Sequence, residues 1–498
     1  MKRTLLIILS VILSISYIFA QNEADALRYS QRFFGTTARS AAMGGAFASL
    51  GGDFATLGYN PAGIGVFRTT ELTFSPSFTM DDAATTFYGD RRTESDYSMG
   101  LNNLGFIASF NRNSESGLVG TNFGLGYHRH NDFNRRQIIE GVNPHSSMAD
   151  YFWLNAEGFD PAGLDPFWER LAYDTYVIDS DPEDAASYFP LVPLGTRQRE
   201  IISTSGNTGE WLFSFGANFD HRFYLGATFG IETVDYTRNS NYTETNIGDL
   251  DEYYFEEFRF RRSMNTSGTG YTFKAGAIYT PVDMLRLGAS VHLPTFYNLT
   301  DEWSHEMESW FAADFPPGSY HNAVPTTPND NPIGPRVKDY SLTTPFRFIG
   351  GVGLMLPGQL GVISLDYEYI DYTAMRLRET DGGYDFYEDN QVIQNVYRAT
   401  ENLKGGVELR LGQFMLRGGY AIYGSPFASG QLNEDAGHTA YSGGFGFRER
   451  NFYIDLAFVR TMQDMNYFLY DQVPGMEMEA ARGSFTNDRL LITAGIRF

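Results

Sequence analysis

Residues 487–498 read NDRLLITAGIRF, and this stretch decides the fold class. From Leu490 to Phe498 every second residue is apolar, whereas the positions between them are mostly polar. A period of two is typical of a β-strand with one apolar and one polar face. A strand that closes the chain on an aromatic residue is typical of a bacterial outer-membrane barrel, whose last strand carries its assembly signal there.

The same alternation recurs upstream, in segments 285–293, 402–411, 414–422 and 452–458. In each of them one face is apolar, and the other carries most of the polar and charged residues. Charges facing lipid are costly in a membrane barrel, so the second face is expected to look into a lumen.

The links between strands alternate in length along the chain. Short links at 220–222, 281–284, 356–359, 412–413 and 449–451 separate long ones at 81–100, 130–210, 237–267, 298–341, 373–397, 424–437 and 462–486. Outer-membrane barrels have short periplasmic turns and long outer loops. We therefore predict an all-β antiparallel barrel of about fourteen strands over 70–498, an even number as such barrels have.

The strands are expected to begin near residues 70, 101, 119, 211, 223, 268, 285, 342, 360, 398, 414, 438, 451 and 487. Segment 253–264 also alternates, and it fits either an outer-loop ribbon or an extension of its neighbour. The alternative architecture is a secreted protein of several β-sandwich domains, which does not predict the regular change between short and long links.

Composition narrows the class of protein. The 498-residue chain has a net charge of −23 and no cysteine. The acidic balance argues against a nucleic-acid partner, which needs a basic face. The lack of cysteine excludes disulfides and thiolate metal sites. A mean hydropathy of −0.29 excludes a bundle of transmembrane helices.

The N-terminal region is expected to have two parts. Residues 1–20 carry two basic residues, an apolar run and a final Ala20, a pattern that predicts a signal peptide; a membrane anchor is the alternative. Residues 21–69 are rich in small residues and lack a strand period. We predict that they form a compact plug, or hatch, because a wide barrel leaves a lumen its own side chains do not fill.

Two stretches carry a resemblance to a known family. They are ARSAAMGGAFASLGGDFATLGYNPAGIGVF (38–67), with Asn60, Pro61 and Ala62 as its motif, and GYTFKAGAIYTPVDMLRLGASVHLPT (270–295). Both resemble the FadL/TodX family of outer-membrane transporters of hydrophobic compounds, in a Bacteroidetes-type form. The resemblance implies a fourteen-stranded barrel with a hatch, whose glycines here are Gly44, Gly45, Gly51, Gly52, Gly58 and Gly63.

The resemblance also implies a function. A hydrophobic molecule such as a long-chain fatty acid would bind at the outer loops and move to a pocket in the barrel. A change in the hatch would then release it, with sideways exit through a gap in the wall as one route. Strand 119–130 contains Gly120, Gly124 and Gly126 and is the candidate for the gap; simple barrel curvature explains these glycines as well.

Candidate ligand contacts fall in two groups. Aromatic residues of the long loops are candidates for capture, namely Phe152, Trp153, Phe167, Trp168, Trp310 and Phe311. Basic residues of the lumen face are candidates for contact with a ligand head group, namely Lys274, Arg286, Lys404 and Arg417. The alternatives are that the aromatics only pack the loops together, and that the basic residues pair with lumen acids.

No enzymatic activity or cofactor is expected. The sequence has no Gly-x-Ser-x-Gly elbow. His128 and His130 share a strand face, but two ligands do not make a metal site. The other functional class left open is the barrel of a protein-secretion or surface-attachment machinery, with a protein partner at the outer loops. In either class, outer-membrane lipids would surround the barrel.

Overall fold

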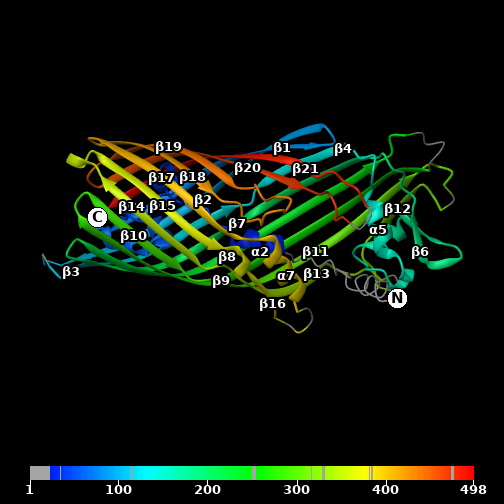
Figure 1. Cartoon of the computed structure of the whole chain (residues 1–498), viewed down its shortest axis with the longest axis horizontal. Helices are drawn as coiled ribbons and strands as arrows, with labels where there is room; N and C mark the ends of the chain where they lie inside the picture. Colours follow the sequence, from blue (N-terminus) through cyan, green and yellow to red (C-terminus); the bar gives the residue numbers. More distant parts are fainter. Residues whose placement is uncertain are drawn as a thin grey trace.

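Fourteen antiparallel strands close into a barrel in the computed structural model (Figure 1). The structure describes the chain except for residues 1–22, 34, 113, 115, 249–253, 316, 328–330, 381, 383–384 and 473–475. The segment predicted as a signal peptide lies outside the described residues. The barrel closes between the first and last strands, from the pair Glu71 and Arg497 to the pair Thr86 and Arg482.

Four strands of the wall are each interrupted once and therefore carry two labels: β3 continues as β4, β10 as β11, β13 as β14 and β15 as β16. The short strand β12 is not part of this count, since it pairs only with the end of β11. The bounds are β1 (Glu71–Phe87), β2 (Asp90–Asn111), β3 (Leu118–Asp132), β4 (Arg135–Val142), β7 (Arg197–Phe219), β8 (Phe223–Thr245), β9 (Phe255–Val282), β10 (Leu285–His292), β11 (Phe296–Phe311), β12 (Tyr320–Ala323), β13 (Arg336–Thr343), β14 (Arg347–Met355), β15 (Gly361–Asp371), β16 (Arg376–Glu379), β17 (Ala399–Leu411), β18 (Phe414–Tyr423), β19 (His438–Arg448), β20 (Phe452–Tyr467) and β21 (Ala481–Arg497).

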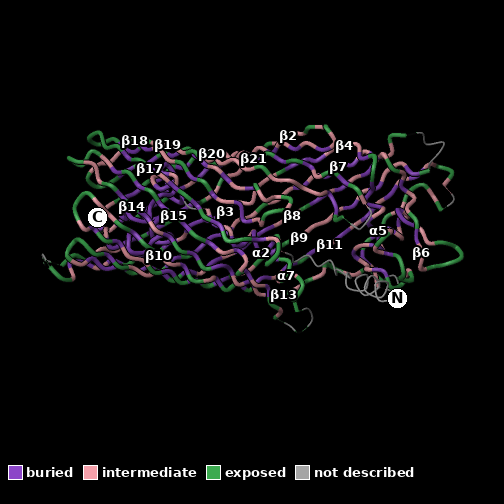
Figure 2. Tube along the Cα trace, in the orientation of Figure 1, coloured by how far each residue is buried: buried purple, intermediate pink, exposed green. Residues whose placement is uncertain are grey.

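The alternation of outward and inward side chains that the C-terminal stretch predicted is found in the barrel wall. On β21, Leu490, Ile492 and Ile496 are 41–49% exposed on the outside, whereas Leu491 and Thr493 face inward and are buried. Figure 2 shows the same change between buried and exposed residues along neighbouring strands. The outer face therefore has the apolar band expected of a barrel in a bilayer.

Several strands continue far beyond this band. Strands β7 and β8 have 23 residues each and β9 has 28, whereas about 9–11 residues cross a membrane. Much of 130–210, 237–267 and 298–341, predicted as loop, is therefore strand. Within segment 253–264, the described residues from Phe255 onward extend the neighbouring strand as the start of β9. Its inward-facing Phe258 and Phe260 give the alternation noted in the sequence. The extensions of β7 and β8 have polar outer faces, so no apolar period reveals them.

Two inserts complete the molecule. The hatch consists of α2 (Glu23–Ser30), α3 (Ala38–Ala42), α4 (Thr56–Tyr59) and η1 (Pro61–Val66), and it lies inside the barrel. A cap of α5 (Met148–Ala156), η2 (Pro161–Gly163), α6 (Glu169–Asp174), β5 (Ile178–Asp181) and β6 (Asp184–Pro190) covers the end where the long strands finish. The remaining short elements are η3 (Pro357–Gln359), η4 (Tyr372–Ala374) and α7 (Tyr387–Val396).

None of the helices in the described part of the chain is both long and apolar enough to cross a membrane.

Candidate functional site

The motif residues of the hatch join it to the wall. Asn60 is extended, as expected before a proline, and its side-chain oxygen accepts from the Ala62 amide at 3.1 Å, which caps η1. Its Nδ2 donates to the Ala48 carbonyl of the hatch at 2.5 Å and to the Ala277 carbonyl of β9 at 3.3 Å. Pro61 begins η1. One side chain thus fixes a turn within the hatch and ties that turn to the barrel.

The hatch glycines serve two different purposes. Gly44, Gly45, Gly51 and Gly52 have φ between 64° and 76°, a conformation that other residues adopt only with strain. Gly58 and Gly63 permit close contact instead: a Cβ at Gly58 would lie 1.8 Å from Cε1 of His128, and one at Gly63 would lie 2.7 Å from Cβ of Thr56.

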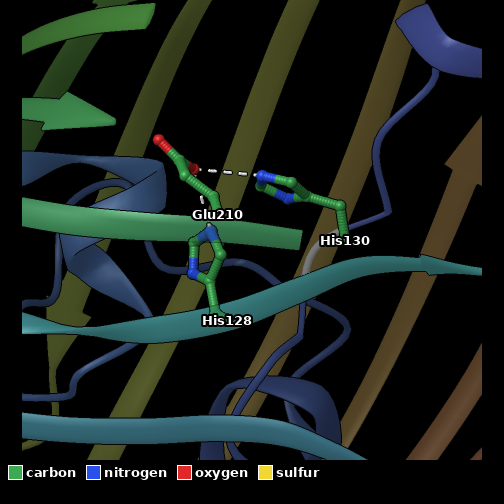
Figure 3. A group of neighbouring side chains, drawn as sticks. All are labelled: His128, His130 and Glu210. Atoms are coloured by element: carbon green, nitrogen blue, oxygen red, sulfur yellow. Dashed lines mark hydrogen bonds and ion pairs between the residues drawn. The ribbon is translucent and has the colours of Figure 1, made fainter. Parts of the chain in front are cut away.

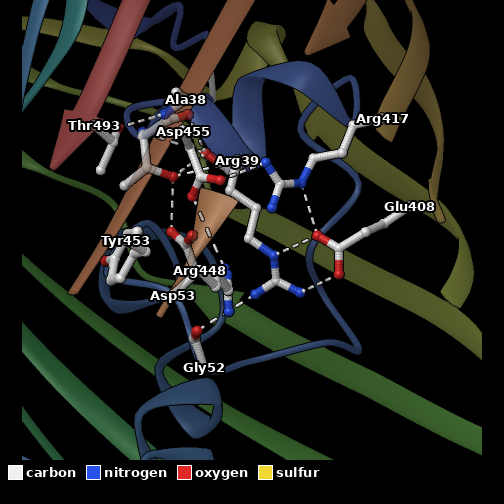
Figure 4. A network of polar contacts seen from close by, with 12 residues as sticks. Ala38, Arg39, Gly52, Asp53, Glu408, Arg417, Arg448, Tyr453, Asp455 and Thr493 are labelled. Carbon is white, nitrogen blue, oxygen red and sulfur yellow. Dashed lines mark hydrogen bonds and ion pairs between the residues drawn. The ribbon is translucent and has the colours of Figure 1, made fainter. Parts of the chain in front are cut away.

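A network of buried ion pairs anchors the hatch to β17, β18 and β20 (Figure 4). Arg39 of α3 donates through Nε and Nη2 to the two carboxylate oxygens of Glu408, at 2.9 and 3.1 Å. Arg417 donates to Glu408 at 2.7 Å and to Asp455 at 2.6 Å. Bidentate arginine–carboxylate pairs fix orientation as well as position. The network therefore holds the hatch across the lumen.

The wall has a seam between β2 and the β3–β4 strand. Their hydrogen-bonded ladder runs from Asn111 opposite Gly120 to Asn103 opposite His128. Beyond that rung, β2 pairs only with β1, and β4 pairs only with β7. Side chains replace the ladder: Arg129 of β3 donates to Asn102 of β2 at 2.7 Å. We call this region the β2–β3 seam.

The seam starts at the height of the apolar band. Met99 of β2 lies opposite Phe78 of β1, which in turn lies opposite Leu490 of β21. All three side chains face outward, and Met99 is 81% exposed. An unpaired strand edge is unfavourable against lipid, where backbone groups need partners within the protein. Beyond His128, β2 and β4 thus have no main-chain ladder between them.

A cavity of about 770 Å³ lies between the hatch and the cap. Its floor includes α2 of the hatch, and its roof includes Met148, Tyr151 and Trp168 of the cap. Asn131 and Asp132, at the end of β3 beside the seam, also line it. The cavity thus reaches the seam on one side, and the hatch occupies the lumen beneath it.

Two solved structures share this architecture. A FadL homologue of Pseudomonas aeruginosa aligns with a TM-score of 0.56 and 12% identity, over 94% of this chain and 100% of the other. The toluene transporter TodX of Pseudomonas putida aligns with a TM-score of 0.54 and 13% identity, over 94% and 99%. The chain has the FadL/TodX fold. No family model matches the sequence, and no curated protein matches it significantly.

The basic residues predicted to meet a head group do not line the cavity of this FadL/TodX fold. Lys274 contacts Glu210, and Lys404 pairs with Glu368 at 2.9 Å. Arg417 belongs to the hatch network, and Arg286 donates to the Leu50 carbonyl at 2.6 Å. These contacts agree with the alternative stated for the sequence, in which the basic residues are held by contacts within the protein.

Five arginines line the cavity, and none of them is among the candidates from the sequence: Arg28, Arg135, Arg238, Arg262 and Arg489. The side chains of Arg238 of β8 and Arg489 of β21 form no hydrogen bond or ion pair with a described residue, although the carboxylate of Asp132 attracts Arg489 from a distance. Nε of Arg489 is buried without a partner. The strand period predicts that both side chains face the lumen, but whether a carboxylate forms an ion pair with them depends on strands distant in sequence.

The predicted capture residues lie in the cap and on β11. Phe152, Phe167 and Phe311 are at most 3% exposed and pack with other aromatic side chains. Trp153 and Trp310 are partly exposed, and Trp168 lines the cavity. Capture by this group stays a prediction, with Trp168 the member best placed to touch a molecule in the cavity.

Proposed function

We propose that this protein takes up hydrophobic compounds across the outer membrane of a Gram-negative bacterium. The observation that carries the proposal is the cavity between cap and hatch, which borders the β2–β3 seam. A ligand of about 770 Å³ or less fits within it, a size usual for small-molecule sites. The FadL/TodX fold supports the same function, since the two aligned proteins are a toluene transporter and a FadL homologue.

The ligand class proposed is an amphipathic molecule with an anionic head group, such as a long-chain fatty acid. The guanidinium groups of Arg489 and Arg238 form no hydrogen bond or ion pair with a described residue, and a carboxylate matches their fork of donors. Tyr151, Trp168 and Met148 offer apolar surface on the roof. Binding of a fatty acid would pair its carboxylate with the two arginines and would bury its acyl chain against the roof.

Release is proposed to run sideways through the seam, since the hatch closes the lumen beneath the cavity. Arg129 occupies the seam, and a Cβ at Gly100 would lie 2.4 Å from its Nη1 atom. Movement of this side chain together with the hatch would open a path to the lipid. Sideways exit keeps an apolar molecule out of the periplasmic water.

Mass spectrometry of molecules that remain bound in mild detergent tests the ligand class. We expect a stoichiometric fatty acid in the wild-type protein and at least a several-fold loss in Arg489→Gln. Arg460→Gln is the matched control, because Arg460 lies on the same side of the membrane but pairs with Asp488 on the exposed surface. A neutral aromatic ligand would overturn the fatty-acid assignment, and an empty barrel with a co-purifying protein would favour the secretion function.

A disulfide across the seam tests the exit route in a chain without cysteine. Ser98 and Asp132 contact one another across the seam, with Oγ and Oδ2 3.2 Å apart. We expect oxidised Ser98→Cys/Asp132→Cys to bind fatty acid but to stop its uptake, and reduction to restore uptake. Ser109→Cys/Asn122→Cys, across an intact rung of the same two strands, is the control. Undiminished uptake through a fully cross-linked seam would refute sideways exit.

A further inference from the structure

A cluster of three buried side chains lies at the start of the seam, formed by His128 and His130 of β3 and Glu210 of β7 (Figure 3). Nε2 of each histidine lies 3.0 Å from Oε2 of Glu210. The three residues are at most 2% exposed. We propose that this cluster binds a first-row divalent transition metal, with Zn²⁺ as the representative ion.

The local backbone is shaped to bring these groups together. His128 lies directly opposite Glu210 in the β3–β7 ladder. Arg129 and Asn131 then pair with Gly209 and Thr208, which leaves His130 as the extra residue of a bulge. Bulges redirect side chains and are common beside functional sites. Here the bulge places the second imidazole over the carboxylate that the first already meets.

Two glycines make room for the cluster. A Cβ at Gly58 of the hatch would lie 1.8 Å from Cε1 of His128, and a Cβ at Gly230 of β8 would lie 1.8 Å from Oε1 of Glu210. The space around the three side chains is therefore bounded by the hatch and by β8, as well as by β3 and β7, which carry the ligands.

The hydrogen bonds within the cluster are unevenly distributed over its polar atoms. Both imidazoles and the Lys274 ammonium converge on Oε2 of Glu210, whereas Oε1 is buried without a partner. Nδ1 of His128 and Nδ1 of His130 are also buried without partners. Buried polar atoms usually have partners. Three possible ligand atoms, one from each residue, lie within 4.8 Å of one another, and the unpaired Oε1 gives the carboxylate a second oxygen for the ion or for Lys274.

The donor set indicates the kind of metal. Two imidazoles and one carboxylate suit zinc and its neighbours better than Mg²⁺ or Ca²⁺, which prefer oxygen ligands alone. Tetrahedral bonds of about 2.0 Å place ligand atoms roughly 3.3 Å apart. Each Nε2–Oε2 separation of 3.0 Å would widen by a few tenths of an ångström, and the two imidazole nitrogens, which lie within 4.8 Å of each other, would adjust around the ion. His130 also lines the cavity, which provides a path of entry and a place for a water ligand.

Lys274 would compete with a metal ion for the carboxylate of Glu210. Its ammonium contacts the same Oε2 atom and is fully buried. A metal ion there would repel it, and Lys274 would turn to the unpartnered Oε1. When bound, the metal would tie β3 to β7 at the last rung of the β2–β3 ladder, where Asn103 faces His128. The site would thus brace the wall where the seam begins.

Zinc binding by the mature protein, purified in detergent without a histidine tag and stripped with a chelator, tests the proposal. After addition of Zn²⁺ and removal of the excess, elemental analysis should find one ion per chain, which His130→Ala and Glu210→Gln should lose. Lys274→Met should bind Zn²⁺ about 10- to 100-fold more tightly, the range by which neighbours of metal ligands alter affinity. His438→Ala, which removes another buried histidine, should retain the ion.

Folding of each variant is checked by the heat-dependent mobility of the barrel on gels. Visible absorption of Co²⁺ added to the wild-type protein gives a second measurement, because tetrahedral nitrogen and oxygen ligands produce a characteristic spectrum. Failure of folded Lys274→Met to bind Zn²⁺, or binding that survives His130→Ala, would overturn the proposal.

Discussion

At the scale of single residues, the inward-facing arginines of the barrel fall into two groups, those paired with carboxylates and those without an ion pair. Arg417 is fixed by Glu408 and Asp455 and has a structural role. Arg489 has the same side chain and the same inward orientation, yet it lines the cavity and forms no ion pair with a described acid, since Asp132 attracts it only from a distance. Residue type and strand face were therefore insufficient to identify a ligand contact, because what distinguishes these arginines is whether another strand supplies a carboxylate.

Glu169 of the cap provides a prediction of pH dependence. It is 8% exposed, and burial raises the pKa of its carboxyl to about 7. The folded cap keeps the proton at pH values where the unfolded segment loses it. This contribution to stability is complete below about pH 4.5 and is lost as the pH rises to about 7, by roughly 3 kcal/mol at most.

Glu169→Gln should therefore stabilise the cap above pH 7 and have little effect at pH 4. Hydrogen exchange of residues 147–190 in the variant and the wild type, compared at each pH, measures this. Glu183→Gln, at an exposed position of the cap, is the control. Equal protection of the Glu169→Gln and wild-type caps at pH 8 would contradict the prediction.

At the scale of elements, the hatch is held by contacts from all around the barrel. Asn60 ties η1 to β9, and Arg39 ties α3 to β17. The hatch motif and the glycines were recognisable in sequence because they need particular backbone geometry. The partners on the strands were not, since a contact such as Arg39 with Glu408 joins residues 369 positions apart.

Removal of Glu408 should loosen the hatch. Glu408→Ala takes both acceptors from Arg39 and one from Arg417, which leaves buried charge without compensation; loss of about 3–5 kcal/mol is usual for such a change. Asp488→Ala breaks an exposed pair with Arg460 and should cost about 1 kcal/mol or less. Denaturant unfolding in detergent and protease sensitivity of residues 23–69 measure both. Similar losses in the two variants would argue against the anchor.

At the scale of the whole molecule, barrel closure depends on the terminal strand. β21 pairs with β20 on one side and with β1 on the other. Phe498 lies just beyond the ladder, and its amide donates to the Thr70 carbonyl at 2.9 Å while its ring is 74% exposed. The Phe498 side chain therefore adds little to packing in the closed barrel.

Deletion of Phe498 should lower the yield of folded barrel several-fold in cells and leave the stability of the barrels that do fold nearly unchanged. Heat-dependent gel mobility of outer-membrane fractions measures the yield. Phe452→Ala, which removes another outward-facing ring, should fold normally. A normal yield from the deletion would show that the terminal aromatic is dispensable.

The sequence by itself determined the features that depend on neighbouring residues. A period of two in segments such as 487–498 predicted the strands and their inward and outward faces, and the alternation of links predicted fourteen of them, as found. The stretch around Asn60 and Pro61 predicted a non-strand hatch, because small residues and a fixed proline φ act locally.

The tertiary structure decided everything that depends on register between distant segments. It decided that the β2–β3 ladder stops at His128, that Glu210 lies opposite that histidine, and that Arg489 forms no ion pair with a described residue. It also decided how far β7 and β8 extend, since their extensions carry no apolar period. A lumen gathers side chains from strands hundreds of residues apart, so its pairings follow from barrel geometry rather than from local pattern.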